Sequence, residues 1–355
     1  LQQRGKRTEA LAVYGDALEL SPEDAGLHHD HGVALLEALR LDDAVSSLRR
    51  AVHLGAASKT AAADLDRASQ MQRCEREARR PEVAPTLPVS AAELAAGQLR
   101  PETVEFARRL FFEYGVLVIE NVFDAELVHR CREHFVREYA DYFRPGNRPS
   151  DALAIGNKRY QITFAIEGPF NNPGIYANPF IMQLMARLLD PKFQLGCTVC
   201  AASLPGAKDQ HLHKDHRGLF TKNVDDPPMT LPPFAITTMV PMVPLDEMTG
   251  TTTVRKGSHQ LSRPDSAAMP RQLPIVDVGS CFLMDMRLSH AGLGNKTDQV
   301  RPILNMVYQQ RWFADNKNFS KQHALKVPAG EYEKIPEEHR KLFAWAVQPG
   351  PDISR

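Results

Sequence analysis

The sequence predicts a mixed α+β chain, with a helical segment first, a linker next and a β-rich domain with flanking helices last. Small and large apolar residues recur at helical spacing within about the first 75 residues, in two copies 34 positions apart. From about residue 159, short apolar or alternating runs alternate with Gly, Pro or Asn, which indicates strands in a closed or double-sheet β architecture. The length of 355 residues suits about two domains.

The helical repeat is readable in TEALAVYGDALEL (8–20) and DDAVSSLRRAVHL (42–54). Small residues at matching positions let two helices approach closely, and larger ones fill the space between them. This pattern resembles the tetratricopeptide repeat, although His28 stands at the family's tryptophan position and Ala56 replaces the closing proline. The matched pairs are Ala10 with Ala44, Tyr14 with Leu48, Ala17 with Ala51, and Leu20 with Leu54.

We expect residues 1–78 to form this tetratricopeptide-like segment, 79–99 a Pro-rich linker and 100–355 the β-rich domain. About three repeats are usually needed for independent stability, and only one and a half are readable. The segment is therefore expected to pack on the next domain or to continue upstream, and a start at Leu1 in mid-unit favours truncation. Its role is open between a docking groove for a protein or peptide partner and a structural cap or dimerisation element.

Composition excludes several classes of protein. Lys plus Arg and Asp plus Glu each total 43, so the formal net charge is zero. Such a chain has no strong field to attract nucleic acid or an anionic membrane. No stretch reaches the ~20 apolar residues of a membrane-spanning helix, and no signal peptide is readable. The five scattered cysteines favour a reducing compartment and hence a cytoplasmic protein.

Helices and strands of the β-rich domain can be predicted in order. Pro101 near the first turn starts a helix to about residue 115, a strand follows to about residue 123, and Asp124 starts a helix through about Tyr142. The later strand-like runs are 159–166, 193–204, 234–245, 250–258, 280–290 and 301–313.

Two histidines and one aspartate stand out as candidate metal ligands. His213 and Asp215 are two residues apart in QHLHKDH (210–216), and such residues of a strand point to the same side. His290 supplies a third candidate from a distant run. Two histidines and one carboxylate make the facial triad of non-haem Fe(II) oxygenases, which leaves three coordination positions open. The sequence therefore predicts an Fe(II) site at His213, Asp215 and His290, the residues expected to support catalysis.

Arg301 follows His290 by eleven residues and starts the next strand-like run. Its guanidinium fork suits a bidentate grip on a carboxylate. 2-Oxoglutarate chelates iron through its keto and C1 carboxylate oxygens, so its other carboxylate needs such a partner. The spacing favours 2-oxoglutarate as a cosubstrate, whereas the alternative for Arg301 is a surface ion pair.

The segment from His290 to Arg301, HAGLGNKTDQVR, resembles the distal histidine segment of the phytanoyl-CoA dioxygenase family. In that family an H…G.N.(S/T)…R pattern carries the last iron ligand and the cosubstrate arginine, and Asn295 and Thr297 match it. GVLVIENVFDAELV (115–128) resembles the family's opening strand and helix. The resemblance implies a double-stranded β-helix, which is a jelly-roll or cupin-like core, over about residues 100–315.

A second motif departs from the family in part. TGTTTVRKGSH (249–259) resembles the family's NGAL…PGSH turn, but Lys256 replaces the usual proline. Thr251 and Thr252 replace the usual small and apolar residues, which alters the local pocket and so bears on the substrate. We expect Thr252 and Thr297, one from each motif, to join Arg301 in binding the cosubstrate.

The resemblance implies an Fe(II)- and 2-oxoglutarate-dependent dioxygenase that uses O2 and releases succinate and CO2, with ascorbate needed in vitro. Hydroxylation of a C–H bond is the expected reaction, while desaturation, epimerisation or cyclisation use the same oxidant. Asp215 argues against halogenation, which needs Gly or Ala at that position to admit a halide. The expected substrate is a polar or anionic small molecule, a peptide or a carrier-bound compound. The candidate substrate residues are Tyr160, Gln161, Thr163, Lys222, Arg255 and Arg311.

Two other functions stay open at this point. The chain could be a tetratricopeptide scaffold whose oxygenase-like domain is non-catalytic, although a desolvated carboxylate beside two imidazoles has no structural need there. The same fold also holds other divalent metals in cupin-like hydrolases and isomerases. Binding of 2-oxoglutarate separates the oxygenase from both.

Overall fold

The structure is a computed structural model that describes residues 2–56, 59–144, 152–216, 218–219, 231–346 and 353–354. It divides into two compact units. The helical unit comprises residues 1–80 and 87–107, and the sheet unit comprises residues 81–86 and 108–355. Residues 87–99, which the sequence suggests as linker, therefore cluster with the helical unit.

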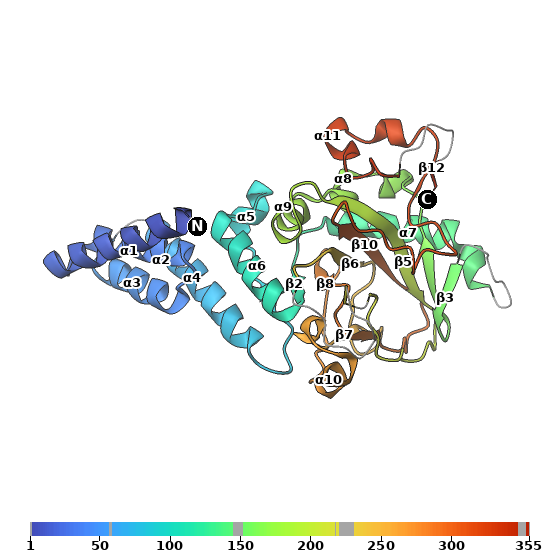
Figure 1. Ribbon diagram of the computed structural model, residues 1–355, viewed down its shortest axis with the longest axis horizontal. Coiled ribbons are helices and arrows are strands. Elements are labelled where there is room, and N and C mark those ends of the chain that lie inside the picture. Colours follow the sequence, from blue (N-terminus) through green and yellow to red (C-terminus); the bar gives the residue numbers. More distant parts are fainter. Residues whose placement is uncertain are drawn as a thin grey trace. The chain divides into compact units, whose positions relative to one another are not determined.

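The helical unit consists mainly of helices. Their buried residues are mainly Leu and Ala, as the 3.6-residue pattern predicts. The helices are α1 (Gln2–Leu20), α2 (Ala25–Glu37), α3 (Leu41–His53), α4 (Lys59–Ala78), α5 (Ala91–Ala96) and the first half of α6 (Pro101–Tyr114) (Figure 1).

Helices α2 and α3 pack closely because small residues lie where they meet. A Cβ added to Gly32 would lie 2.6 Å from Cγ of Leu48, so only glycine fits against that leucine. Ala44 and Ala51, on either side of Leu48 along α3, are completely buried. The small and large residues of the second repeat stretch thus serve the packing that the sequence predicts.

Helix α4 and the 87–107 segment share a network of buried charges. The guanidinium of Arg67 pairs with the carboxylate of Glu102, and both side chains are 9% exposed. Asp64 accepts a hydrogen bond from His29 Nε2 at 3.1 Å. The Arg67–Glu102 pair joins α4 to α6 and so helps to explain why the segment after the Pro-rich stretch packs with the helical unit.

The core of the sheet unit is an eight-stranded sheet. Strands β5, β10 and β6 lie side by side at its centre (Figure 1), and the printed pairings from β2 to β3 are antiparallel. In order across the sheet, the strands are β1 (Thr86–Leu87), β2 (Val116–Ile119), β8 (Cys281–Asp285), β6 (Ala235–Pro241), β10 (Arg301–Gln309), β5 (Gln194–Ser203), β4 (Arg159–Thr163) and β3 (Ala152–Gly156).

A small second sheet pairs β7 (Thr252–Val254) with β9 (His290–Gly292), and His213 extends it through a bridge to His290. An apolar cluster joins Val254 of this small sheet to Phe282 and Met284 of the large one. Strands β11 (Lys326–Val327) and β12 (Ile353–Ser354) form a separate pair. The arrangement is mixed α+β and is consistent with the expected cupin-like core.

Helices and short turns flank the large sheet. Asp124 caps α7 by accepting a hydrogen bond from the Glu126 N–H at 2.9 Å, as the predicted helix start requires. The helices are α7 (Ala125–Glu138), α8 (Pro173–Tyr176), α9 (Pro179–Leu188), α10 (Arg263–Ala268) and α11 (Glu337–Arg340), with 3₁₀ turns η1 (Ala140–Phe143), η2 (Gly168–Phe170), η3 (Ser258–Gln260) and η4 (Tyr332–Lys334).

The predicted run 280–290 is not one strand. A corner follows β8, where Arg287 donates to both carboxylate oxygens of Asp285, at 2.8 and 2.7 Å, and the Leu288 N–H bonds to the Asp285 carbonyl at 2.9 Å. Both charged side chains are at most 3% exposed. This corner carries the chain from the large sheet to the small one, so His290 opens a strand instead of ending one.

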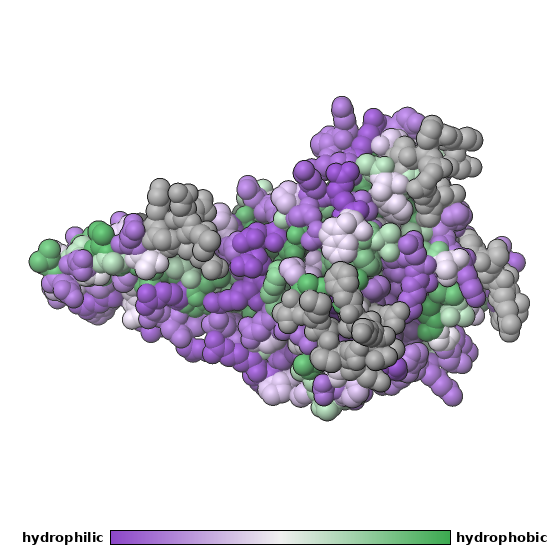
Figure 2. All heavy atoms as spheres, in the orientation of Figure 1, coloured by the Kyte–Doolittle hydropathy of each residue, from purple (hydrophilic) through white to green (hydrophobic). Residues whose placement is uncertain are grey.

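Hydrophilic side chains cover most of the face shown in Figure 2, with apolar ones scattered among them. Within the described ranges, no helix is both long and apolar enough to cross a membrane.

Candidate active site

A cavity of about 680 Å³ lies between the inner face of the large sheet and the small sheet. Its walls take alternate residues from the strands, such as Arg301, Ile303, Asn305 and Val307 of β10. This alternation is what the pleat of a strand imposes. The volume is in the range of small-molecule sites.

His213, Asp215 and His290 meet on one wall of this cavity. Their ligand atoms all lie within 4.8 Å of one another, so they could hold one metal ion. Nε2 of His290 is 3.5 Å from Oδ1 of Asp215, and Nε2 of His213 is 4.0 Å from the same atom. Imidazole and carboxylate donors on one side of a metal fit non-haem Fe(II).

Backbone hydrogen bonds fix how the two imidazoles face. Nδ1 of His213 lies 2.9 Å from the His211 carbonyl, and Nδ1 of His290 lies 3.0 Å from the Leu288 carbonyl. With the proton on Nδ1, each ring donates to its carbonyl and directs a bare Nε2 into the cavity. Burial, together with His290, lowers the pKa of His213 and so favours the neutral, metal-binding form.

Arg301 is 1% exposed and lies in the cavity wall. Its Nη2 donates to the Ser203 hydroxyl at 2.7 Å, and its Nη1 donates to the Gly250 carbonyl. Its Nε has no hydrogen-bond partner among the described residues. Burial, together with Arg159, lowers the pKa of Arg301 to about 9. A buried cation with a free donor fits the carboxylate of a cosubstrate.

Arg159 of β4 is a second buried guanidinium in the cavity, and sequence reasoning missed it. Its Nη2 donates to the Leu293 carbonyl at 2.7 Å. Leu293 lies two residues after Ala291, which is the β9 residue that pairs with Thr253. A Cβ added to Gly292 would lie 2.5 Å from Arg159 Nη1, so a side chain there would force the Arg159 guanidinium to move. Arg159 thus ties β4 to the strand that begins with His290.

Residues 111–303, more than half of the chain, match the family described as phytanoyl-CoA dioxygenase (PhyH). The chain belongs to this family. Members of the phytanoyl-CoA dioxygenase family use Fe(II) and 2-oxoglutarate, and the donor set and the buried arginine described above fit both groups. Fe(II) and 2-oxoglutarate are therefore its cofactors.

Solved structures also resemble the chain. The non-haem α-ketoglutarate-dependent epimerase SnoN of nogalamycin biosynthesis is 18% identical, with a TM-score of 0.45 over 59% of this chain and 84% of that one. AviO1 from Streptomyces viridochromogenes Tue57 is 17% identical, with a TM-score of 0.46 over 63% and 97%. HygX from Streptomyces hygroscopicus, solved with nickel and 2-oxoglutarate, is 15% identical, with a TM-score of 0.41 over 64% and 89%. These values are too low to bear on activity.

Among the other predicted cosubstrate residues, Thr252 lines the cavity and is 4% exposed. Thr297 is not among the residues that line it. Its hydroxyl donates to Asn295 Oδ1 at 2.7 Å and closes a turn in the family's distal motif. The motif match at Thr297 therefore has a local structural reason.

The predicted substrate residues are mostly elsewhere. Gln161 lines the cavity, whereas Tyr160 does not, because neighbouring residues of β4 alternate between the two faces of the sheet. Arg255 donates to the Met269 carbonyl, and Arg311 is exposed. Thr163 is buried and donates to the His323 carbonyl at 2.5 Å. Lys222 lies outside the described residues.

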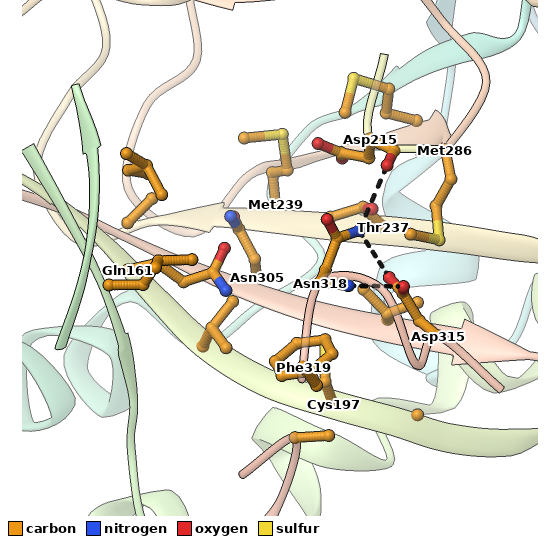
Figure 3. Close-up of a pocket in the computed structure, with 18 of the residues that line it drawn as sticks. Gln161, Cys197, Asp215, Thr237, Met239, Met286, Asn305, Asp315, Asn318 and Phe319 are labelled. Atoms are coloured by element: carbon orange, nitrogen blue, oxygen red, sulfur yellow. Dashed lines mark hydrogen bonds between the residues drawn. The ribbon is translucent and has the colours of Figure 1, made fainter. Parts of the chain in front are cut away.

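The segment after β10 contributes cavity residues that sequence reasoning did not find. Asn318 Nδ2 donates to the Asp215 carbonyl at 3.2 Å and to Asp315 Oδ2 at 2.7 Å, so it lies between these two residues (Figure 3). Phe319 and Trp345 also line the cavity. This segment has no periodicity that could have shown where its side chains point.

Proposed function

We propose that this chain is a 2-oxoglutarate-dependent dioxygenase that hydroxylates a C–H bond of a small molecule and releases succinate and CO2. The observation that carries the proposal is one cavity whose walls hold His213, Asp215, His290 and the buried Arg301. The cavity is partly open to solvent, and its volume of about 680 Å³ suits a small substrate beside the cosubstrate.

In this proposal His213, Asp215 and His290 hold Fe(II), and Arg301 binds the distal carboxylate of 2-oxoglutarate, with Thr252 beside it. When bound, iron and 2-oxoglutarate supply an oxidant from O2. The carbonyls of His211 and Leu288 keep both imidazoles turned toward the metal.

The test measures succinate released from 2-oxoglutarate with Fe(II), O2 and ascorbate, with and without a library of metabolites. Asp215→Ala should lower the rate by more than about a hundredfold. Even the loss of a residue that only orients a metal ligand lowers metal affinity or activity about 10–100-fold. His129→Ala changes an exposed histidine outside the cavity and should leave the rate unchanged. Equal succinate release from Asp215→Ala and the parent chain would contradict the proposal and favour a non-catalytic scaffold.

Product analysis separates hydroxylation from its alternatives. Hydroxylation adds one oxygen atom from O2 to the substrate, whereas desaturation or cyclisation removes two hydrogen atoms and epimerisation leaves the formula unchanged. Mass spectrometry after turnover under ¹⁸O2 distinguishes these outcomes. A product without ¹⁸O would contradict hydroxylation. It would leave standing the assignment as a 2-oxoglutarate-dependent enzyme that releases succinate.

For the helical unit, we propose a tetratricopeptide-like segment over residues 1–78 that recruits a peptide or carrier-bound substrate to an oxygenase domain at 100–355. Its support is the α2/α3 packing at Gly32 and the exposed Leu20, which is 86% accessible. Leu20→Glu should slow turnover of a tethered substrate more than that of its free fragment, while Glu9→Gln, also exposed, should change neither. Equal rates on both substrates would contradict recruitment.

A further inference from the structure

The cavity changes character along β10. Arg159, Ser203 and Arg301 are register partners across β4, β5 and β10, so they form one row at one end of the cavity. Ile303, Asn305 and Val307 follow Arg301 on the same face. At about 3.3 Å per residue, Val307 lies roughly 20 Å from Arg301 along the strand. We call these the arginine end and the far end.

The three candidate metal ligands lie between the two ends. Gly292 of β9 contacts Arg159 at the arginine end, and His290 lies two residues back along the same strand. Further back, the Met286 N–H bonds to the Ala235 carbonyl beside the far end. A cosubstrate held by Arg301 therefore leaves the far end for the substrate.

The far end is largely apolar. Cys197, Met286 and Val307 belong to one apolar cluster, and Phe319 and Trp345 pack against it. All five also line the cavity. A substrate here must present mainly carbon skeleton to these walls, because polar groups left without partners would cost free energy on burial.

Several polar groups of the far end offer acceptors of hydrogen bonds. Asp315 lines the cavity with its carboxylate held by the Asn318 N–H and Nδ2, at 3.0 and 2.7 Å, which leaves further lone pairs free. Thr237 is 3% exposed, and its hydroxyl has no partner among the described residues; the same holds for Oδ1 of Asn305. A ligand with hydrogen-bond donors would satisfy these atoms.

In the described walls the buried cationic groups lie away from the far end, whereas Lys317 lines the cavity but is exposed. Both guanidiniums are at the arginine end. The Lys214 ammonium donates to the Ser258 and Leu261 carbonyls, at 2.7 and 2.8 Å. An anionic substrate at the far end would meet the Asp315 carboxylate, and no buried cationic side chain of the described walls lies beside it to compensate.

We propose that the far end binds a small molecule with an apolar skeleton that presents an amine or hydroxyl donor to Asp315 and Asn305. This inference rests on the proposed function and narrows its substrate class. It excludes acyl-CoA thioesters and other phosphate- or carboxylate-bearing substrates from this site, and it replaces the polar or anionic substrate expected from the sequence. The arginine end, in contrast, takes the dianionic cosubstrate.

The test uses three probes with one skeleton: 1-adamantanamine, 1-adamantanol and adamantane-1-carboxylate. Each is titrated calorimetrically into the full chain loaded with Fe(II) and 2-oxoglutarate without oxygen. We expect the amine and the alcohol to bind, and the carboxylate to bind at least about tenfold more weakly because of like-charge repulsion. The amine and alcohol arms distinguish an ionic contact to Asp315 from a neutral hydrogen bond.

Variants assign the donor contacts. Asp315→Asn should weaken the amine about tenfold or more and change the alcohol by less than about threefold, because only the charge-assisted part is lost. Asn305→Leu, which keeps the volume and removes the amide, should weaken both. Glu247→Gln removes an exposed carboxylate outside the cavity and should change neither.

Two outcomes would overturn the inference while 2-oxoglutarate still binds, as judged by the thermal stabilisation it gives. In one, the chain binds adamantane-1-carboxylate as tightly as 1-adamantanamine or more tightly, and the Asp315→Asn variant does the same. The other is no binding by any of the three probes at millimolar concentration. Loss of 2-oxoglutarate binding in the parent chain would instead contradict the proposed function itself.

Discussion

A buried arginine of the helical unit pairs with a carboxylate, whereas the two buried arginines in the cavity wall of the sheet unit do not. Arg67 pairs with Glu102 within the helical unit, and Asp64 bonds to His29. Arg159 and Arg301 are at least as buried, at 2% and 1% exposure. Their hydrogen bonds go to carbonyls and to one hydroxyl, with no ion pair to a carboxylate among the described residues.

The difference separates structure from binding. In a buried ion pair each charge is neutralised by its partner within the folded chain. Removing one partner leaves the other charge buried alone, which lowers the free energy of unfolding. A buried guanidinium with a free Nε is incomplete, and an anion from outside can complete it. The cavity therefore holds destabilising charge that a dianionic cosubstrate would offset. Four substitutions test this contrast, in order of decreasing effect.

Arg67→Met should lower the free energy of unfolding by about 3–5 kcal/mol, because it leaves Glu102 buried without its cation. Urea unfolding followed by far-UV circular dichroism measures the change. The double variant Arg67→Met/Glu102→Leu is the control and should recover most of the loss. An unchanged unfolding free energy in the single variant would show that the pair contributes little.

Arg301→Met should weaken 2-oxoglutarate binding about a hundredfold, which is about 2.8 kcal/mol. It should leave the ligand-free chain equally or more stable, because no carboxylate loses a partner. Calorimetry and urea unfolding measure the two effects. Arg311→Met changes an exposed arginine outside the cavity and should alter neither. A ligand-free destabilisation as large as that of Arg67→Met would make Arg301 structural and break the comparison.

Glu93→Gln tests a buried anion whose partners are all within the helical unit. Burial alone would raise the pKa of Glu93, but hydrogen bonds from the Arg100 N–H, Thr103 and Ser90 outweigh it and leave the pKa below its ordinary 4.5. A depressed pKa stabilises the fold above pH 4.5, and the contribution is lost as pH falls through the folded-state value.

The variant should therefore be less stable than the parent by about 1–2 kcal/mol at pH 7, and the difference should shrink below pH 4.5. Unfolding midpoints across an acid pH series measure it. A difference that stays constant down to acid pH would show that the charge of Glu93 is not what stabilises the unit.

Thr237→Val should change the free energy of unfolding by less than about 0.5 kcal/mol, because its hydroxyl has no partner to lose. Thr253→Val is the matched control, since both threonines are 3% exposed and the Thr253 hydroxyl donates to the Gln272 carbonyl at 3.0 Å. The control should cost about 1 kcal/mol. Equal losses in thermal unfolding would mean that Thr237 has a structural partner.

The elements with strong local patterns could be predicted from the sequence. The helix start at Asp124 and the small residues Ala44 and Ala51 follow from capping and packing rules: Asp124 makes the capping hydrogen bond, and both alanines are completely buried. His213, Asp215 and His290 could be singled out because metal chemistry restricts the donor types, and the structure brings these three together.

The substrate wall could not be predicted in the same way. Alternation along β4 says that Arg159 and Gln161 share a face and Tyr160 takes the other, but it does not say which face meets the cavity. That depends on the sheet's partners, which are distant in sequence. Asp315 and Asn318 lie in an irregular segment, where only tertiary contacts determine orientation.

The corner at Asp285 and Arg287 makes the length of the chain between the two sheets critical. Only Leu288 and Ser289 separate this corner from His290, so one residue inserted or deleted there would move His290 out of its pairing with His213 and Val254. Substitutions at the positions between are tolerable if size and polarity are kept. A change in their number is not, which makes this short stretch a poor place for engineered insertions.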